Sequence, residues 1–321
     1  MLCAMTPMRD DLQRIERLRE LFLDESRGDR ALPDYWRGPM DLAAYASVLA
    51  VRIGWKWDAA LSECKDRGFA RADQETVLDF GCGSGIAAER FVHHFGAREV
   101  WLHDRSATAR AYACERVATS NPGLTTKAIA DARTVSPDVL LVSHVLGELD
   151  DRGRQVLREL IGRSRRVVLV EPGNHTTSRR LSALRQELLA DFEVLAPCPH
   201  AAACPALARD EDWCHFFAEP SQLAFTNSAW VKISKELGID QRSLPYAFLA
   251  LAHKPVETKL AAPPHRVLFR PDLGKHDARV QLCTDHGLVE ALVTKRADPA
   301  TFRTLKKNPE SVRTLPAPDA R

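Results

Sequence analysis

The sequence contains no run of about 18 or more apolar residues, so we expect no membrane span. Residues 1–19 also lack the apolar core of a signal peptide, and Asp10, Asp11 and Glu16 are atypical of an acid-poor transit peptide. We therefore expect a cytoplasmic protein. In a reducing compartment the eight cysteines are candidates for metal ligands or buried thiols, and not for a disulfide framework.

A strong net charge of either sign is absent as well, because 45 basic residues stand against 43 acidic ones. The charge is unevenly distributed. Residues 253–321 carry 13 Lys and Arg against 8 Asp and Glu, a net charge of +5, whereas residues 1–252 have a net charge of −3. A basic C-terminal segment suits contact with RNA phosphates, but it is equally typical of a solvated, lysine-rich surface.

The most informative stretch is residues 77–85, Val-Leu-Asp-Phe-Gly-Cys-Gly-Ser-Gly, which is followed by a helical pattern over Ile86–Phe95. A dinucleotide fingerprint requires a small residue at position 86, and the sequence has Ile86 there. The pattern D-x-G-x-G-x-G instead resembles motif I of the S-adenosylmethionine-dependent methyltransferases, in which the acid and the glycine turn face the methionine end of the cofactor. The resemblance assigns cofactor binding to Asp79, Gly81, Gly83 and Gly85.

Strands and helices alternate after this motif, which predicts an α/β fold with a parallel, Rossmann-like sheet. The expected strands are Thr76–Phe80, Glu99–His103, Thr126–Ala130, Asp138–Ser143 and Arg166–Val170. Ligands bind at the carboxyl ends of such strands.

Several polar residues stand at these strand ends. Asp104 lies about 20 residues beyond the glycine turn, where a Rossmann-like domain places the acid for the ribose hydroxyls. In methyltransferases the pair at Asp131-Ala132 commonly lies beside the adenine. His144 and Glu171 also follow strands, and each is a candidate for a catalytic base or for a residue that only lines the site.

Three regions are expected along the chain: a helical N-terminal region (1–72), a methyltransferase-like domain (73–252), and a basic C-terminal β unit with a tail (253–321). The first contains two helical patterns, Arg9–Ser26 and Met40–Cys64, for which packing on the next domain is favoured over contact with RNA. The third contains short strand-like pieces at Arg266–Phe269, Arg279–Cys283 and Leu288–Thr294. Thr301–Arg321 is expected to be an extended basic end.

A cysteine-rich insertion (197–217) interrupts the second region. It contains Cys198, Cys204 and Cys214 together with His200 and His215. Clustered thiols in a reducing compartment indicate a metal site, with ordinary buried thiols as the alternative. The spacing C-x5-C-x9-C matches neither a short zinc finger nor a ferredoxin run, so zinc and iron–sulfur both remain open.

Three short motifs that follow motif I in the sequence resemble one family. They are Cys198-Pro199-His200, Cys204-Pro205 and residues 212–216 (Asp-Trp-Cys-His-Phe). It is the methyltransferase-like small-ribosomal-subunit family, a mitochondrial ribosome small-subunit assembly factor and its bacterial relatives. Residues 144–149, 171–173 and 281–283 resemble it too. The resemblance implies a [4Fe–4S] cluster held by four thiolates: Cys198, Cys204, Cys214 and Cys283. The remaining cysteines match nothing in the family's pattern: Cys3, Cys64, Cys82 and Cys114.

Three functions are compatible with these observations. The first is an S-adenosylmethionine-dependent methyltransferase that acts on the small ribosomal subunit or its RNA, as a monomer. The second is a non-catalytic assembly factor that binds ribosomal RNA, because the sequence lacks the Asn-Pro-Pro-Tyr motif of amino-methylating enzymes. The third is a small-molecule methyltransferase with a structural zinc ion. If the metal is zinc, His200 or His215 is an alternative to Cys283 as the fourth ligand.

Overall fold

The computed structural model describes residues 9–24, 30–255 and 265–316 of the chain. The chain divides into two units that are interleaved in the sequence. Unit 1 comprises Met1–Ser62, Ala70–Val170 and Glu219–Leu244, and unit 2 comprises Glu63–Phe69, Glu171–Ala218 and Pro245–Arg321. These units cut across the three consecutive regions expected from the sequence, and that division stays a prediction.

Unit 1 is built on a parallel sheet. Its strand order is β3 (Thr125–Ile129), β2 (Glu99–His103), β1 (Thr76–Phe80), β4 (Val139–Ser143) and β5 (Arg166–Pro172). All five residues of the central strand β1 are buried, as expected where helices cover both faces, whereas β3 at the edge is mostly exposed. The alternation of strands and helices therefore predicted the fold class correctly: it is α/β and Rossmann-like.

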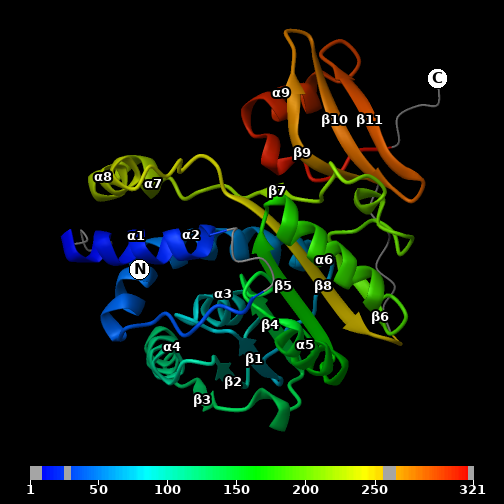
Figure 1. Ribbon diagram of the computed structural model, residues 1–321. Helices are drawn as coiled ribbons and strands as arrows, with labels where there is room; N and C mark the ends of the chain where they lie inside the picture. Colours follow the sequence, from blue (N-terminus) through cyan, green and yellow to red (C-terminus); the bar gives the residue numbers. More distant parts are fainter. Residues whose placement is uncertain (1–8, 25–29, 256–264, 317–321) are drawn as a thin grey trace. The chain divides into compact units, whose positions relative to one another are not determined.

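Three helices connect these strands: α3 (Ile86–Phe95), α4 (Ala107–Ser120) and α5 (Asp151–Arg163), shown around the sheet in Figure 1. α3 buries Phe91 and Phe95 on one face. Asp150 caps α5, because its side chain accepts a hydrogen bond from Gly153 N, and such a cap contributes about 1 kcal/mol. A short 3-10 turn, η2 (Ala132–Thr134), follows β3.

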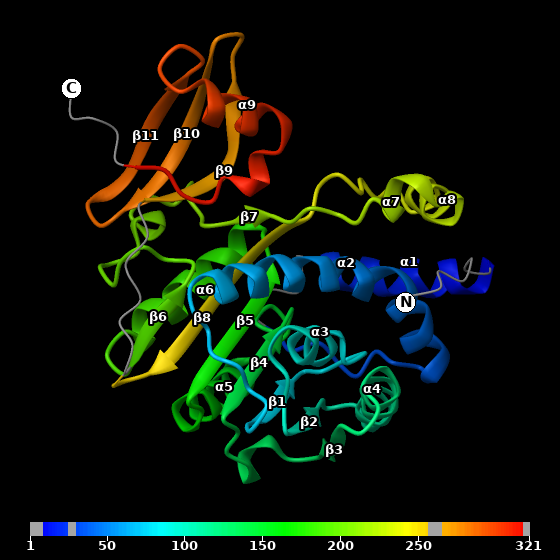
Figure 2. The ribbon, with the colours of Figure 1, turned by 180° about the vertical axis from the view of Figure 1, so that it is seen from behind.

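The N-terminal helices α1 (Arg9–Leu23) and α2 (Pro39–Asp66) lie alongside α7 (Leu223–Thr226) and α8 (Ser228–Glu236) in both Figure 1 and Figure 2. Ile15, Val48, Trp230 and Ile233 belong to one buried apolar cluster that α1, α2 and α8 share. The two N-terminal helices were expected and α8 was not, although Asn227 is a recognisable cap that accepts from Ala229 N and Trp230 N. Within the described ranges no helix combines the length and apolar character needed to cross a bilayer.

Unit 2 contains α6 (His175–Leu188) and an antiparallel group in which β8 (Pro245–His253) pairs with β6 (Phe192–Ala196) and with β7 (Phe216–Phe217). A second 3-10 turn, η3 (Pro205–Leu207), lies in the cysteine-rich segment. Asn174 caps α6 by accepting from Thr177 N. Ser178, Leu181, Ser182 and Arg185 of α6 line one pocket together with residues that follow β6.

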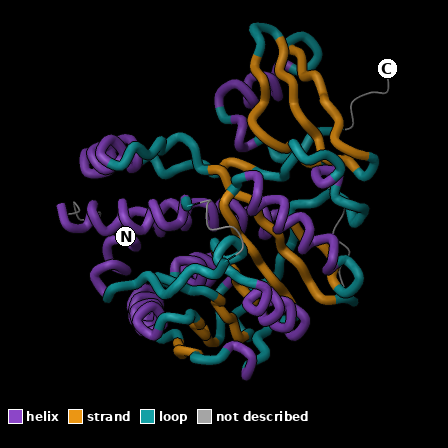
Figure 3. Tube along the Cα trace, viewed as in Figure 1, coloured by secondary structure: helices purple, strands orange, loops and turns teal. Residues whose placement is uncertain are grey.

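The C-terminal part of unit 2 is a three-stranded antiparallel sheet in the order β11 (Gly287–Thr294), β10 (Asp277–Thr284) and β9 (Arg266–Leu273). Helix α9 (Pro299–Lys307) and the turn η4 (Pro309–Ser311) follow it, and Figure 3 shows this helix beside the strands. The expected extended end from Thr301 is wrong over this part. Phe302 and Leu305 are buried in the core of the sheet, and Asp298 caps the helix ahead of Pro299. Residues 317–321 lie outside the described residues.

Candidate functional site

The glycine turn between β1 and α3 is held by backbone hydrogen bonds to β2. The N–H groups of Gly81 and Cys82 both donate to His103 O, at 2.8 and 2.9 Å. Gly81, Gly83 and Gly85 have φ values of +75°, +48° and +76°, a region that favours glycine. The turn therefore requires glycine at these three positions, which is the physical basis of the motif read from the sequence.

Asp79 lies directly before the turn and is 0 % exposed. Its Oδ2 accepts a hydrogen bond from Ala88 N at 3.2 Å, while its Oδ1 has no hydrogen-bond partner among the described residues. Burial, and to a lesser extent the charge of Asp104, raises the pKa of this carboxyl to about 7. Asp79 is thus an incompletely satisfied acid at the end of the central strand.

Asp104 is joined to the same turn. Its Oδ2 accepts from Gly83 N at 3.0 Å, and its Oδ1 accepts from Ser106 N at 2.9 Å. Burial raises the pKa of Asp104, although both backbone hydrogen bonds act in the opposite direction. A carboxylate has about four lone-pair positions, so these two bonds leave acceptor capacity for a ligand.

Asp131 and Ala132, the two residues expected beside the adenine, follow β3 and differ in exposure. Asp131 is exposed and forms a short ion pair with Arg133, 2.7 Å between Oδ2 and Nη2. The hydrogen bonds from the Arg133 side chain lower the pKa of Asp131 to about 2. Ala132, in contrast, is buried. Asp131 therefore directs its charge to Arg133 in this structure.

His144 follows β4 with a φ of +56°, which is uncommon for a residue other than glycine. Its Nε2 is buried and has no hydrogen-bond partner within the described part of the chain. Burial, with a further contribution from the Lys56 charge, holds the pKa of His144 well below its usual 6.5, so the ring is neutral at pH 7. Glu171, the other catalytic candidate, is 0 % exposed and lies within β5, not after the strand as expected. The boundary between the units falls after Val170, so this end of β5 belongs to unit 2.

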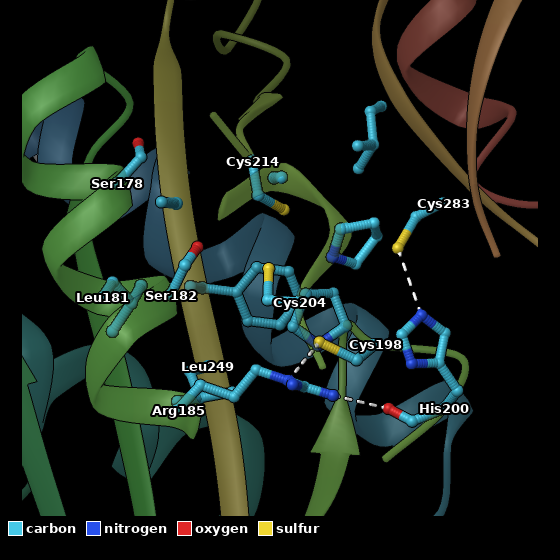
Figure 4. A pocket seen from close by; sticks show the side chains of 16 residues that line it. Ser178, Leu181, Ser182, Arg185, Cys198, His200, Cys204, Cys214, Leu249 and Cys283 are labelled. Carbon is cyan, nitrogen blue, oxygen red and sulfur yellow. Dashed lines mark hydrogen bonds between the residues drawn. The ribbon is translucent and has the colours of Figure 1, made fainter. Parts of the chain in front are cut away.

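A second site lies within unit 2, where four cysteines line one pocket (Figure 4). Cys198 follows β6, Cys204 precedes η3, Cys214 precedes β7 and Cys283 lies on β10. Figure 4 shows their sulfur atoms facing the pocket from these four segments. The structure thus brings Cys283 to the three cysteines of the insertion across 69 residues of sequence.

Two arginines hold this pocket together. The Arg185 Nε donates to Cys198 Sγ at 3.2 Å, and its Nη atoms donate to the carbonyl oxygens of His200 and Ala202. The Arg67 guanidinium donates to the carbonyl oxygens of residues 195, 197 and 198 at 2.6–3.1 Å. The path of the chain around Cys198 is therefore fixed by two buried or half-buried cations.

Three of the four pocket thiols have a raised pKa because they are buried. Burial raises the pKa of Cys198, raises that of Cys214 well above 9 and raises that of Cys283 to about 12, and the neighbouring thiols act in the same direction. Among the residues that the structure describes, no three His, Cys, Asp or Glu side chains are arranged to hold a single metal ion. A metal centre here has to displace the thiol protons.

The two histidines of the insertion differ in position. His200 lines the pocket, and its Nε2 lies 3.5 Å from Cys283 Sγ. His215 is instead stacked on the Trp213 ring at a centroid distance of 5.0 Å and packs at a tilt against the Phe269 ring at 4.8 Å. Cys64, Cys82 and Cys114 do not line this pocket, and Cys3 lies outside the described residues.

Sequence reasoning did not identify Arg67, Arg185 or Trp36, which lies beside the glycine turn. For Arg185 a signal existed: Ser178, Leu181, Ser182 and Arg185 share one helical face, and a lone cation on a buried face needs a partner. No comparable signal existed for Trp36, because it lies in an irregular segment remote from the motif.

The parallel sheet, with a glycine turn after its central strand and two acids beside that turn, defines a protein of the α/β, Rossmann-like class. The chain belongs to the family described as mitochondrial small ribosomal subunit Rsm22, whose model matches residues 56–309. The family expected from the sequence is thereby confirmed.

Several solved structures are similar in fold. PH1948 from Pyrococcus horikoshii is 14 % identical with a TM-score of 0.38, covering 74 % of this chain and 98 % of that one. Protein 1320 of Thermoplasma acidophilum is 15 % identical with a TM-score of 0.38, covering 78 % and 100 %. The plantazolicin methyltransferase BpumL in complex with SAH is 11 % identical with a TM-score of 0.41, covering 76 % and 98 %. No curated protein matches the chain in sequence.

Proposed function

We propose that the chain is an S-adenosylmethionine-binding, methyltransferase-like protein that acts on the small ribosomal subunit or its RNA. The observation that carries the cofactor assignment is the glycine turn between two buried acids. A Cβ placed on Gly83 would have one described neighbour within 4 Å, Trp36 Cζ2 at 3.9 Å. The backbone at Gly83 is thus open to a ligand, and the family match supports a role on the small subunit.

The donor set suits this cofactor. S-adenosylmethionine carries positive charge on its sulfonium and amino groups, and the Asp79 Oδ1 that lacks a described partner supplies complementary negative charge. Its ribose hydroxyls are donors, and Asp104 retains acceptor capacity beside the turn.

Calorimetry with S-adenosylhomocysteine and S-adenosylmethionine tests the assignment. Gly83→Val should abolish binding, because the new side chain occupies the ligand's place. Gly123→Val is the matched control, since Gly123 also has a positive φ of +90° and no described atom lies within 4 Å of its Cβ position. Both variants incur a similar backbone cost, so equal affinities in the two would refute the cofactor site.

We further propose that Cys198, Cys204, Cys214 and Cys283 hold a [4Fe–4S] cluster. Four thiols in one pocket form the ligand set of such a cluster. Arg185 and His200 add contacts to the sulfur atoms of Cys198 and Cys283, and hydrogen bonds to sulfur are a recurrent feature that tunes iron–sulfur centres. Zinc with the same four thiolates, or with His200 in place of Cys283, is the competing assignment.

Elemental analysis and absorption of anaerobically purified protein decide between them. We expect iron and sulfide with absorption near ~400 nm, and Cys283→Ser should bleach it. Cys114→Ser is the control, because Cys114 is a half-buried thiol on α4 outside the pocket. About one zinc per chain, without iron or sulfide, would exclude the cluster.

RNA binding is the third part of the proposal. Five basic residues are exposed within the short stretch from the end of β11 through α9: Lys295, Arg296, Arg303, Lys306 and Lys307. Because each phosphate contact releases counterions, affinity for small-subunit RNA should fall steeply with salt. Changing both Lys306 and Lys307 to Glu should reduce the slope of log K against log salt by about 2. The control with the same charge change is Lys275→Glu combined with Arg279→Glu, two exposed residues in the β9–β10 turn and on β10. An equal loss of slope in both double variants would show that α9 is not part of the RNA interface.

A non-catalytic assembly role is the second candidate, favoured by the residues after β4. Val145 and Leu146 are buried there, where an amino-methylating enzyme carries Asn-Pro-Pro-Tyr. Methylation mapping of small-subunit RNA in a deletion strain separates the two roles. A nucleotide whose methylation is restored by the wild-type gene but not by Gly83→Val indicates catalysis. Normal methylation with defective subunit assembly indicates the assembly role.

A further inference from the structure

Residues 30–37 precede α2 and form neither helix nor strand, yet several contacts within unit 1 hold them in place. Leu32 is buried, and its N–H donates to Glu148 O at 3.3 Å. At the other end, Arg37 N donates to Asp41 Oδ2 at 2.9 Å. Asp41 is itself buried and paired with Arg14 and Arg17. The segment is therefore anchored on both sides of Tyr35 and Trp36.

Trp36 lies opposite the glycine turn. Its Cζ2 is the described atom within 4 Å of the Cβ position of Gly83, whose N–H is bonded to Asp104. The indole packs edge-on against Tyr45, with centroids 5.3 Å apart, and against Tyr35 at 4.7 Å. A half-buried aromatic ring that faces an open glycine backbone is the kind of wall that binds a planar or cationic small molecule.

Tyr35 fastens this segment to the strand ends that carry the candidate cofactor residues. Its hydroxyl lies 3.3 Å from Glu148 Oε2 and donates to it. Arg105, which follows Asp104, reaches the same Oε2 at 3.4 Å and lies 5.9 Å from the Tyr35 ring. Burial and the Glu148 charge hold the pKa of Tyr35 well above 10, so the hydroxyl remains a donor at physiological pH.

We propose that residues 30–37 form a lid on the cofactor site, in which Trp36 contacts the bound cofactor and the Tyr35–Glu148 hydrogen bond is the latch. This inference rests on the proposed S-adenosylmethionine site. If the cofactor leaves only when this hydrogen bond breaks, loss of the bond raises the dissociation rate. Loss of the indole removes a direct contact with the cofactor and weakens affinity.

The contact is tested with the full chain and S-adenosylhomocysteine as the probe, by calorimetry. Trp36→Leu should raise Kd by roughly 10-fold or more, because it removes a large aromatic contact. Trp36→Phe, which keeps a ring, should show a smaller loss and guards against a folding defect in the leucine variant. Wild-type affinity in both variants overturns the inference while leaving the proposed site intact.

The latch is tested by the dissociation rate of the same probe in stopped-flow displacement. Tyr35→Phe removes only the hydroxyl and should raise koff by roughly 10-fold, with the association rate changed much less. Tyr112→Phe, a half-buried tyrosine on α4, is the matched control and should leave koff unchanged. A Tyr35→Phe protein with lowered thermal stability but unchanged koff would show a purely structural role and overturn the lid. A wild-type chain that binds neither form of the cofactor overturns the proposed function itself, and the lid with it.

Discussion

Asp79 should destabilise the ligand-free protein, and Asp79→Asn should relieve this cost. The carboxyl is fully buried, accepts one backbone hydrogen bond at Oδ2, and has no described partner at Oδ1. An asparagine keeps the size and can keep the bond from Ala88 N, but it carries no charge to desolvate. The substitution therefore isolates the cost of the charge.

The magnitude follows from the shift between the unfolded and folded states. The pKa rises from 3.8 to about 7 on folding, and at 1.36 kcal/mol per unit this costs about 4 kcal/mol once the acid is fully ionised. Because the folded state binds the proton more tightly, the free energy of unfolding of the wild type falls by this amount as pH rises from about 4 to about 7. Well below pH 3.8 the acid is protonated in both states, and the penalty disappears.

Thermal unfolding of the wild type and Asp79→Asn at pH 4.5 and pH 8 measures this cost. The two proteins should melt at similar temperatures at pH 4.5, and the variant should melt about 5–10 °C higher at pH 8. Asp131→Asn is the control, because Asp131 is also an acid at a strand end but is exposed and paired with Arg133. It should give no such gain.

Cofactor binding should respond in the opposite direction. A cationic ligand favours ionised Asp79, so wild-type affinity for S-adenosylmethionine should rise between pH 6 and pH 8, and the Asp79→Asn affinity should be weaker and independent of pH. The melting experiment has a clear refuting result. If Asp79→Asn is no more stabilised relative to the wild type at pH 8 than at pH 4.5, then ionisation of Asp79 does not destabilise the folded protein, and the reasoning is wrong.

Two further predictions concern the turn and the thiol pocket. Gly81→Ala should lower the free energy of unfolding by about 2–4 kcal/mol, because the new Cβ would overlap the Val145 side chain at a residue with positive φ. Gly123→Ala, which has the positive φ without the overlap, should cost only about 1 kcal/mol. Equal losses for the two variants in urea unfolding would contradict the overlap. Arg185→Gln should lower the reduction potential of a reconstituted cluster, on the order of tens of millivolts, because it removes a positive charge and the hydrogen bond to Cys198 Sγ. An unchanged potential in a redox titration would mean that this bond does not act on the centre.

The parts of this protein that the sequence alone determined depend on short-range rules. Glycines at 81, 83 and 85 are required by positive φ values within one turn, and the ends of β1 and β4 follow from largely apolar, buried runs of about five residues. Asp79 and Asp104 could be assigned because parallel strands place their carboxyl ends at one edge of the sheet. Cys198, Cys204 and Cys214 could be grouped by their clustering in one insertion, whereas Cys283 could be added only through a resemblance to a family.

Tertiary structure alone decided which distant side chains meet. Trp36 lies against Gly83 and Arg185 donates to Cys198, and neither contact follows from the local sequence. The basic end after Thr301 became a helix because Phe302 and Leu305 have a sheet to pack against, a gain that local propensity does not contain. Burial then set the chemistry: the same carboxyl type has a pKa of about 7 at Asp79 and about 2 at Asp131, because one is enclosed without a counter-charge and the other is exposed beside an arginine.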